Sequence, residues 1–268
     1  MKPAWAWQFD PGTLQHVDTS LPAAITRDWA WGDSTGAGVR VAVIDSGIDA
    51  LHPAVRSVAG GAVILADPDA PRGARVIEGP HKDLFGHGTA CAAIIRAVAP
   101  EAELYSVRVL GEKLTGRGAV FAEGMRWAIA NGMHVLNMSL STSRIDYYGL
   151  FHEITDAAYF KRAMVVCAVN NVRAPSYPSQ YASVFSVAAH SGRDPFRLDY
   201  NPAPPVEFGA PGIDLEVAWL GGKTIRATGN SFAAPHVSGL IARILGKHPG
   251  LTPFQMKMVL MAVASNAE

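Results

Sequence analysis

Apolar, β-rich runs alternate with segments of helical periodicity along most of this chain, and this alternation constrains the fold more than any other feature. The expected strands lie at 39–45, 103–109, 133–139, 163–169 and 183–189. The expected helices lie at 87–97, 118–131, 149–161, 231–246 and 253–264. Strands that alternate with helices form parallel sheets whose two faces the helices cover. The sequence therefore predicts an α/β fold with a mostly parallel central sheet flanked by helices.

Two regions outside this alternation are rich in proline and glycine. The stretches 67–80 and 191–205 therefore predict surface loops. The short segments 206–210 and 214–219 predict a small antiparallel edge.

A carboxylate closes the first of the expected strands. Asp45 follows the apolar run and is itself followed by Ser46 and Gly47. Open α/β sheets place their functional groups at the C-terminal ends of strands, so Asp45 is a candidate catalytic acid. An aspartate in this position is also a common turn or helix cap, and Asp45 alone does not decide between the two.

A histidine and a serine begin two of the expected helices. Gly86 and Gly88 flank His87, and small neighbours let a substrate backbone approach an imidazole closely. Ser231 lies where a long apolar helix begins, and unpaired N–H groups there can hold a developing oxyanion. A serine hydroxyl is a weak nucleophile without a base. Taken singly, the first motif is a common loop and the second a common N-cap.

The order acid, base and serine carries the functional prediction. Asp45 lies in Asp45-Ser46-Gly47, His87 in His87-Gly88-Thr89, and the serine in Asn230-Ser231-Phe232-Ala233-Ala234-Pro235. These blocks resemble the three signature blocks of the subtilisin-like serine proteases, the subtilases, and the resemblance extends over about residues 25–265. It implies a three-layer subtilisin-like fold and a serine endopeptidase. Ser231 would be the nucleophile, His87 the general base, and Asp45 the group that orients the imidazole.

The resemblance also implies an oxyanion hole and substrate contacts. The stretch 164–171 is similar to the strand and turn that carry the oxyanion asparagine, so Asn171 would donate to the oxyanion beside the Ser231 backbone N–H. A register shift of one residue would make Asn170 the donor. The substrate-binding residues implied by the resemblance are Ser139, Leu140, Ser141, Ala168, Val169, Asn170 and Phe121.

Several positions depart from the family pattern, and three of them lie in the histidine and serine blocks. Ala90 stands where the family usually has histidine, and Asn230 and Phe232 stand where it usually has threonine and methionine. Asn230 keeps a side chain that forms hydrogen bonds but changes its reach.

The chemistry implied by the resemblance requires no metal ion or cofactor. Many subtilases insert a calcium-binding loop after the histidine helix, but here Pro100 follows that helix almost directly. Carboxylates for a cage of roughly 6–8 oxygens are not clustered there. We therefore predict no metal in the site and no strong calcium site at this loop, and leave calcium binding elsewhere open.

The N-terminus and the cysteines bear on the domain organisation and the location. We expect an N-terminal arm at 1–24 and a catalytic domain at 25–268. Residues 1–9 lack the apolar core of a secretory signal. Cys91 and Cys167 are expected to be free, buried thiols. These features predict a cytoplasmic enzyme, with a secreted mature form as the alternative.

The charge balance limits the expected partners. Lys plus Arg and Asp plus Glu number 23 each, which gives no electrostatic case for a nucleic acid or an acidic membrane. A peptide or protein substrate is the expected partner, and the oligomeric state stays open.

Three functions remain compatible with these residues. The first is a peptide-bond hydrolase, an endopeptidase. The second is a maturation protease or a transpeptidase or macrocyclase for a ribosomal precursor peptide; the transpeptidase or macrocyclase would resolve the same acyl-enzyme with an amine. The third is a non-catalytic peptide-binding scaffold. Product mass distinguishes the first two functions, because hydrolysis adds water, and covalent labelling of the serine distinguishes the third.

Overall fold

The computed structural model describes residues 24–267, so nearly all of the expected arm at 1–24 lies outside the described residues. The described chain forms a nine-stranded sheet with the order β3-β2-β4-β1-β5-β6-β7-β9-β8. Its strands are β1 (Arg40–Asp45), β2 (Gly60–Ala66), β3 (Ala74–Glu78), β4 (Glu103–Arg108), β5 (Val135–Met138), β6 (Met164–Ala168), β7 (Phe185–His190), β8 (Asp199–Tyr200) and β9 (Phe208–Pro211). Neighbouring strands from β2 to β9 pair in parallel, and β3 and β8 are antiparallel at the two edges.

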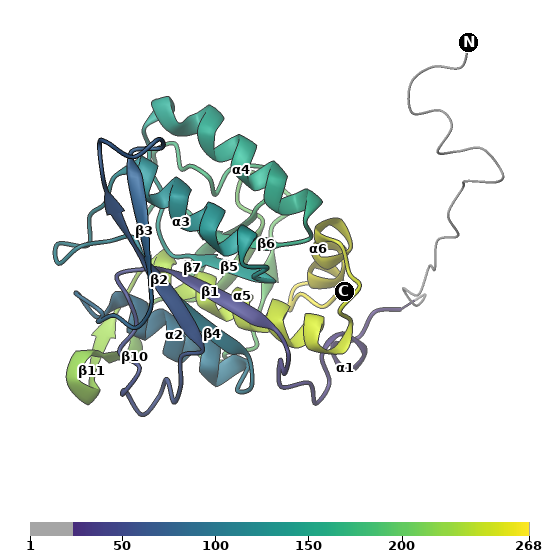
Figure 1. Ribbon diagram of the computed structural model, residues 1–268. Coiled ribbons are helices and arrows are strands. Elements are labelled where there is room, and N and C mark those ends of the chain that lie inside the picture. Colours follow the sequence, from purple (N-terminus) through teal and green to yellow (C-terminus); the bar gives the residue numbers. More distant parts are fainter. Residues whose placement is uncertain (1–23, 268) are drawn as a thin grey trace, which may run out of the picture.

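Helices cover both faces of this sheet (Figure 1). They are α1 (Arg27–Ala30), α2 (His87–Val98), α3 (Gly118–Ala130), α4 (Tyr148–Phe160), α5 (Asn230–Lys247) and α6 (Pro253–Ala262). Alternate residues of β1 divide the core: Val41 and Val43 pack with α2 and α5, whereas Ala42 and Ile44 pack with α3 and α4. Because helices lie on both faces of the sheet, the predicted three-layer α/β fold is confirmed. A parallel strand that is buried on both faces needs a helix layer on each face.

Two local predictions are wrong. The segments at 206–210 and 214–219 do not pair with each other: β9 joins the main sheet beside β7, and β10 (Leu215–Trp219) pairs with β11 (Lys223–Ala227). The stretches 67–80 and 191–205 are not all loop, because β3 lies within the first and pairs with β2, and β8 lies within the second and pairs with β9. In both cases the pairing between strands outweighed the local turn signals. Sequence periodicity does not reveal which strands pair.

The topology brings separate parts of the chain to one edge of the sheet. β1, β5 and β6 are parallel neighbours, so their carboxyl ends open at the same edge. The helices α2 and α5 pack along each other. Ligand sites of open α/β sheets lie at such an edge.

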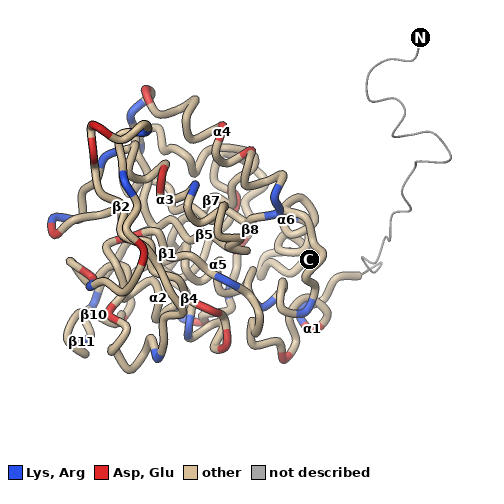
Figure 2. Tube along the Cα trace, in the orientation of Figure 1, with Lys and Arg blue, Asp and Glu red and all other residues tan. Residues whose placement is uncertain are grey.

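Charged residues are distributed without a dominant sign. Lys and Arg lie among Asp and Glu over the side shown in Figure 2, in keeping with the equal totals of 23. Within residues 24–267, none of the helices has the length and apolar character needed to span a bilayer.

Candidate active site

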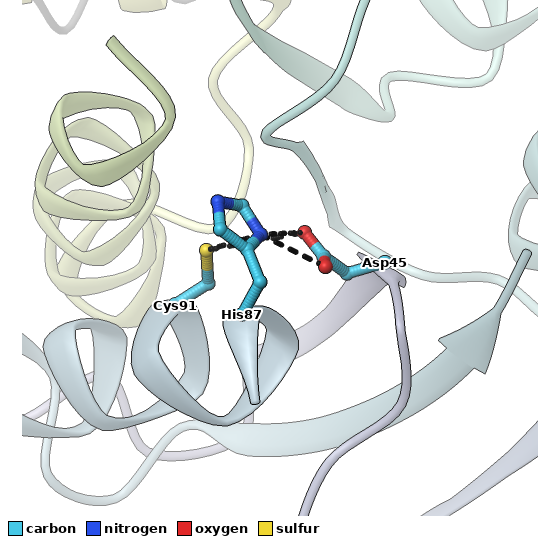
Figure 3. Close-up of side chains that lie close together, drawn as sticks. All are labelled: Asp45, His87 and Cys91. Carbon is cyan, nitrogen blue, oxygen red and sulfur yellow. Dashed lines mark hydrogen bonds and ion pairs between the residues drawn. The ribbon is translucent and has the colours of Figure 1, made fainter. Parts of the chain in front are cut away.

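The last residue of β1 and the first residue of α2 form a buried acid–base pair. Asp45 is fully buried, and His87 is 6% exposed. The His87 Nδ1 atom lies 2.9 Å from each carboxylate oxygen of Asp45. Figure 3 shows this nitrogen directed at Asp45 and the other ring nitrogen directed away from it. A carboxylate on Nδ1 keeps the proton there, which leaves Nε2 free to accept a proton.

Two opposing effects set the pKa of His87. Burial by itself lowers the pKa, because it disfavours the charged imidazolium. The Asp45 carboxylate favours the imidazolium through its charge and its hydrogen bond, Cys91 acts in the same direction, and together they outweigh burial. The pKa of His87 is therefore raised well above its ordinary value of 6.5. The His87 imidazole therefore needs a higher pH to lose its proton than the imidazole of a free histidine does.

The glycines beside His87 are required by close packing. Gly86 has a φ of 111°, and a Cβ there would lie 2.6 Å from the Trp219 ring. A Cβ at Gly88 would lie 2.0 Å from the carbonyl oxygen of Gly47. The backbone that carries the base is thus packed directly against the turn that follows Asp45. A side chain at Gly88 would therefore push the acid away from the base, and one at Gly86 would collide with the Trp219 ring.

Asp83 holds the segment that leads into α2, and sequence reasoning missed it. Its carboxylate accepts hydrogen bonds from the Ser46 hydroxyl at 2.8 Å and from the backbone N–H groups of Phe85 and Gly86 at 2.9 and 2.8 Å. It also accepts from the backbone and the hydroxyl of Thr89 at 3.0 and 2.6 Å. An aspartate just before a helix is a usual capping signal and could have revealed Asp83.

A pocket of about 220 Å³ opens beside His87. Its lining residues are His87, Leu110, Leu114, Phe121, Ser139, Leu140, Ser141, Ala168, Val169, Asn170, Asn171 and Ser231. Every predicted site residue lies in this lining except Asp45, which contacts His87. Leu110 and Leu114 were not predicted, because they follow β4 in a loop without a motif. The structure thus brings the predicted residues together, while their individual roles stay predictions.

The two neighbouring asparagines point in different directions. The Asn171 Oδ1 atom accepts from the Asn230 backbone N–H at 2.9 Å. The position of a Cβ on Gly229 lies 3.7 Å from Asn171 Nδ2 and 3.1 Å from Ser231 Oγ. The Asn170 side chain instead donates to the Pro175 carbonyl at 3.1 Å. This geometry favours Asn171 over Asn170 as the donor near Ser231.

The Cys91 thiol lies directly behind the acid–base pair. Its Sγ atom is 3.2 Å from Ser139 Oγ and 3.7 Å from the Ser231 carbonyl oxygen. Burial raises the pKa of Cys91, which keeps the thiol neutral. Possible ligand atoms of Cys91, Asp45 and His87 lie within 4.8 Å of one another (Figure 3). A metal ion that binds thiols would therefore also reach His87 and would prevent it from acting as the base. Cys91 and Cys167 are both buried and free, as predicted.

The comparison with known protein families decides the assignment. The model of the Subtilase family matches residues 36–268. The chain belongs to the subtilase family. Its relatives include the thermostable alkaline protease of Halalkalibacterium halodurans, which is 33% identical over 96% of this chain and 73% of the relative.

Two further similarities agree with this assignment. Subtilisin BL of Lederbergia lenta is 32% identical to this subtilase over 87% of the chain and 85% of the relative. The crystal structure of a cold-adapted subtilisin-like serine proteinase matches with a TM-score of 0.69 and 24% identity, and covers 88% of this chain and 87% of that one. The structural match supports the fold, and the sequence matches support the activity. This subtilase is a serine protease, a peptide hydrolase that acts on peptides or proteins.

The predicted cytoplasmic location is wrong. The relatives are subtilisins and alkaline proteases, which are mainly secreted, extracellular enzymes. The prediction rested partly on residues 1–9, which lie outside the described residues. It also rested on free cysteines, but both thiols are buried in the packed core as small apolar groups, and such cysteines do not report the compartment. The division of the subtilase at residues 24 and 25 stays a prediction.

Mercuric ion is expected to abolish the proteolytic activity of the wild-type subtilase and to spare a Cys91→Ala variant. Mercury bound at Sγ would lie against Asp45 and His87 and would take the base out of position. The measurement is residual hydrolysis of a chromogenic peptide after incubation with mercuric chloride. Cys167→Ala is the matched control, because Cys167 is equally buried but lies in β6. Equal inhibition of Cys91→Ala and wild type would contradict the expectation.

Proposed function

We propose that this subtilase is an endopeptidase that cleaves peptide bonds through an acyl-enzyme on Ser231. One observation carries the proposal. Both carboxylate oxygens of Asp45 hold His87 Nδ1 at 2.9 Å, and the same His87 lines one pocket with Ser231 and Asn171. Nucleophile, base, orienting acid and oxyanion donor are the four groups that acyl transfer needs.

The proposed reaction assigns one proton path to His87. Nε2 accepts the hydroxyl proton as Ser231 Oγ attacks the carbonyl carbon of the substrate. Asn171 Nδ2 and the Ser231 backbone N–H bind the oxyanion of the tetrahedral intermediate. The imidazolium, stabilised by Asp45, then gives its proton to the leaving amine. Water, deprotonated by the same nitrogen, resolves the acyl-enzyme and releases the acid product.

The lining of the pocket supports a preference for apolar substrate residues. Leu110, Leu114, Phe121 and Leu140 supply apolar walls, and the lining holds no acidic side chain that would attract a basic residue. Apolar walls favour a side chain that leaves water on binding. Because residues 139–142 and 168–172 include no acidic side chain, we propose that a medium-sized apolar or aromatic residue precedes the cleaved bond, and that Leu140 and Phe121 contact the fourth substrate residue before that bond.

Replacing Asn171 with alanine is expected to lower kcat by about 10²- to 10³-fold, the range measured for the oxyanion asparagine of subtilisin. KM should change little, because the donor acts mainly on the oxyanion of the transition state. Steady-state hydrolysis of a chromogenic peptide measures both constants. Asn170→Ala is the matched control, since its amide is bound to Pro175. A larger loss of kcat in Asn170→Ala than in Asn171→Ala would mean that the register is wrong by one residue.

The transpeptidase alternative shares every step up to the acyl-enzyme. No contact among the described residues favours an amine over water as the second nucleophile, so hydrolysis is the function we propose. The proposed steps use no metal ion, and the predicted lack of a strong calcium loop after α2 stays a prediction.

A further inference from the structure

The side chain of Asn230, one residue before the nucleophile, ties together two strand ends. Its Oδ1 atom accepts from the backbone N–H of Ala189, near the end of β7, at 2.9 Å. Its Nδ2 atom donates to the carbonyl oxygens of Val169 and Asn170, just after β6, at 3.2 and 3.0 Å. The amide therefore bridges the ends of β6 and β7 at the edge where the pocket opens.

These contacts occupy the donors of the Asn230 amide completely. A primary amide has two N–H groups, and here each carbonyl takes one. A threonine hydroxyl, usual at this position in the family, has a single O–H and could satisfy one of the two carbonyls. The hydrogen bonds that connect the ends of β6 and β7 in this way therefore require the asparagine at position 230.

The main chain of Asn230 completes a link to the proposed oxyanion donor. Its backbone N–H donates to Asn171 Oδ1 at 2.9 Å, which fixes one end of the Asn171 amide. The other end, Nδ2, makes no hydrogen bond to residues in the described range 24–267 and lies 3.7 Å from the Cβ position on Gly229. Asn230 thus holds both the backbone that leads into Asn171 and the side-chain oxygen of Asn171.

We propose that Asn230 is the positioning residue of the oxyanion hole: it holds the amide of Asn171 where the oxyanion forms. The proposal rests on the proposed function, because it assigns Asn171 as the donor. The polar side-chain atoms of Asn230 and its backbone N–H are hydrogen-bonded to Ala189, Val169, Asn170 and Asn171, and none of these partners is a group that reacts in the proposed mechanism. The effect of Asn230 reaches the substrate through the Val169–Asn170 backbone and through Asn171. A displacement of about 1 Å at such a donor costs up to about 10²-fold in rate.

A double-mutant cycle tests the proposal. Asn230→Ala is expected to lower kcat about tenfold to a hundredfold with little change in KM, because the positioned donor acts in the transition state. In the Asn171→Ala background the same substitution should lower kcat by less than about threefold, because no donor is left to misplace. Each kcat is expressed per active site titrated with a fluorophosphonate, so that misfolded protein does not count.

Each outcome of the cycle has a definite meaning. Equal losses of kcat from Asn230→Ala in both backgrounds, or a change in KM alone, would overturn the positioning role. If Asn171→Ala shows the expected loss of kcat of about 10²- to 10³-fold but the Asn230 effects are additive, the proposed function stands and this inference alone is rejected. An unaltered kcat in Asn171→Ala would instead reject the oxyanion assignment.

A second variant, Asn230→Ser, keeps the proposal testable if Asn230→Ala fails to fold. Asn230→Ser keeps one donor and one acceptor, so it should fold and lose part of the kcat. The loss should again shrink in the Asn171→Ala background. Thermal unfolding of each variant should show no correlation with kcat. If kcat instead fell in step with the unfolding temperature across the variants, the residue would be merely structural.

Discussion

Replacing His87 with alanine is expected to lower kcat on the order of 10⁶-fold, the size of loss measured when the histidine or the serine of the subtilisin triad is removed. The reason is geometric. His87 is the basic side chain that lines the pocket with Ser231, and a serine hydroxyl without a base is a weak nucleophile. The measurement is steady-state hydrolysis of a chromogenic peptide, with fold checked by thermal unfolding.

The control for this substitution is a histidine far from the pocket. His152 lies on α4, about half exposed, and its ring nitrogen is 3.5 Å from Asp156. His152→Ala should therefore keep wild-type kcat/KM. If His87→Ala retained activity within about tenfold of wild type while folded, His87 would not be the base.

Replacing Asp45 with asparagine is expected to lower kcat about 10⁴-fold and to shift the pH profile. Catalysis needs neutral His87, so kcat/KM rises with pH through its pKa in the free enzyme. Asp45 raises that pKa well above 6.5, so the wild-type midpoint should lie above pH 6.5. The neutral amide removes the Asp45 charge, which is the largest of the effects that raise the pKa, while burial, which lowers the pKa, remains. The midpoint of Asp45→Asn should therefore move to lower pH.

The measurement is kcat/KM from about pH 5 to about pH 10 at constant ionic strength. Asp146→Asn is the matched control, because Asp146 lies on the surface in an ion pair with Arg144. Its profile should superimpose on that of wild type. A midpoint that stayed in place or rose in Asp45→Asn would mean that Asp45 does not set the pKa of His87.

The parts of the fold and site that the sequence predicted are those with a local signal. β1 showed a buried apolar run that ends in a carboxylate, and α2 and α5 showed small residues after His87 and Ser231. These patterns depend on residues adjacent in the chain. The motifs therefore placed the acid, the base and the serine at the correct ends of their elements.

The parts that were missed depend on contacts between distant segments. Nothing near β9 in the sequence shows that it pairs in parallel with β7 rather than forming a separate edge. Asp83 binds Ser46, which lies 37 positions away, and Asn230 binds Ala189, which lies 41 positions away. Such partners become visible when the chain is folded, because hydrogen-bond geometry, not spacing, selects them.

The oxyanion register illustrates the same limit at the scale of one residue. Asn170 and Asn171 are chemically identical and adjacent, so no periodicity separates them. The Pro175 carbonyl occupies one amide and the Asn230 backbone orients the other. The two amides therefore differ only in their hydrogen-bond partners, which the folded turn after β6 determines and the order of residues does not show.

Covalent labelling of Ser231 tests the central claim most directly. The intact mass of wild-type protein treated with a fluorophosphonate should show a single adduct, and Ser231→Ala should show none, because His87 activates this one hydroxyl. Peptide mapping would place the adduct at the start of α5. Folded wild-type protein without an adduct, or an equal adduct on Ser231→Ala, would contradict the assignment of Ser231 as the nucleophile.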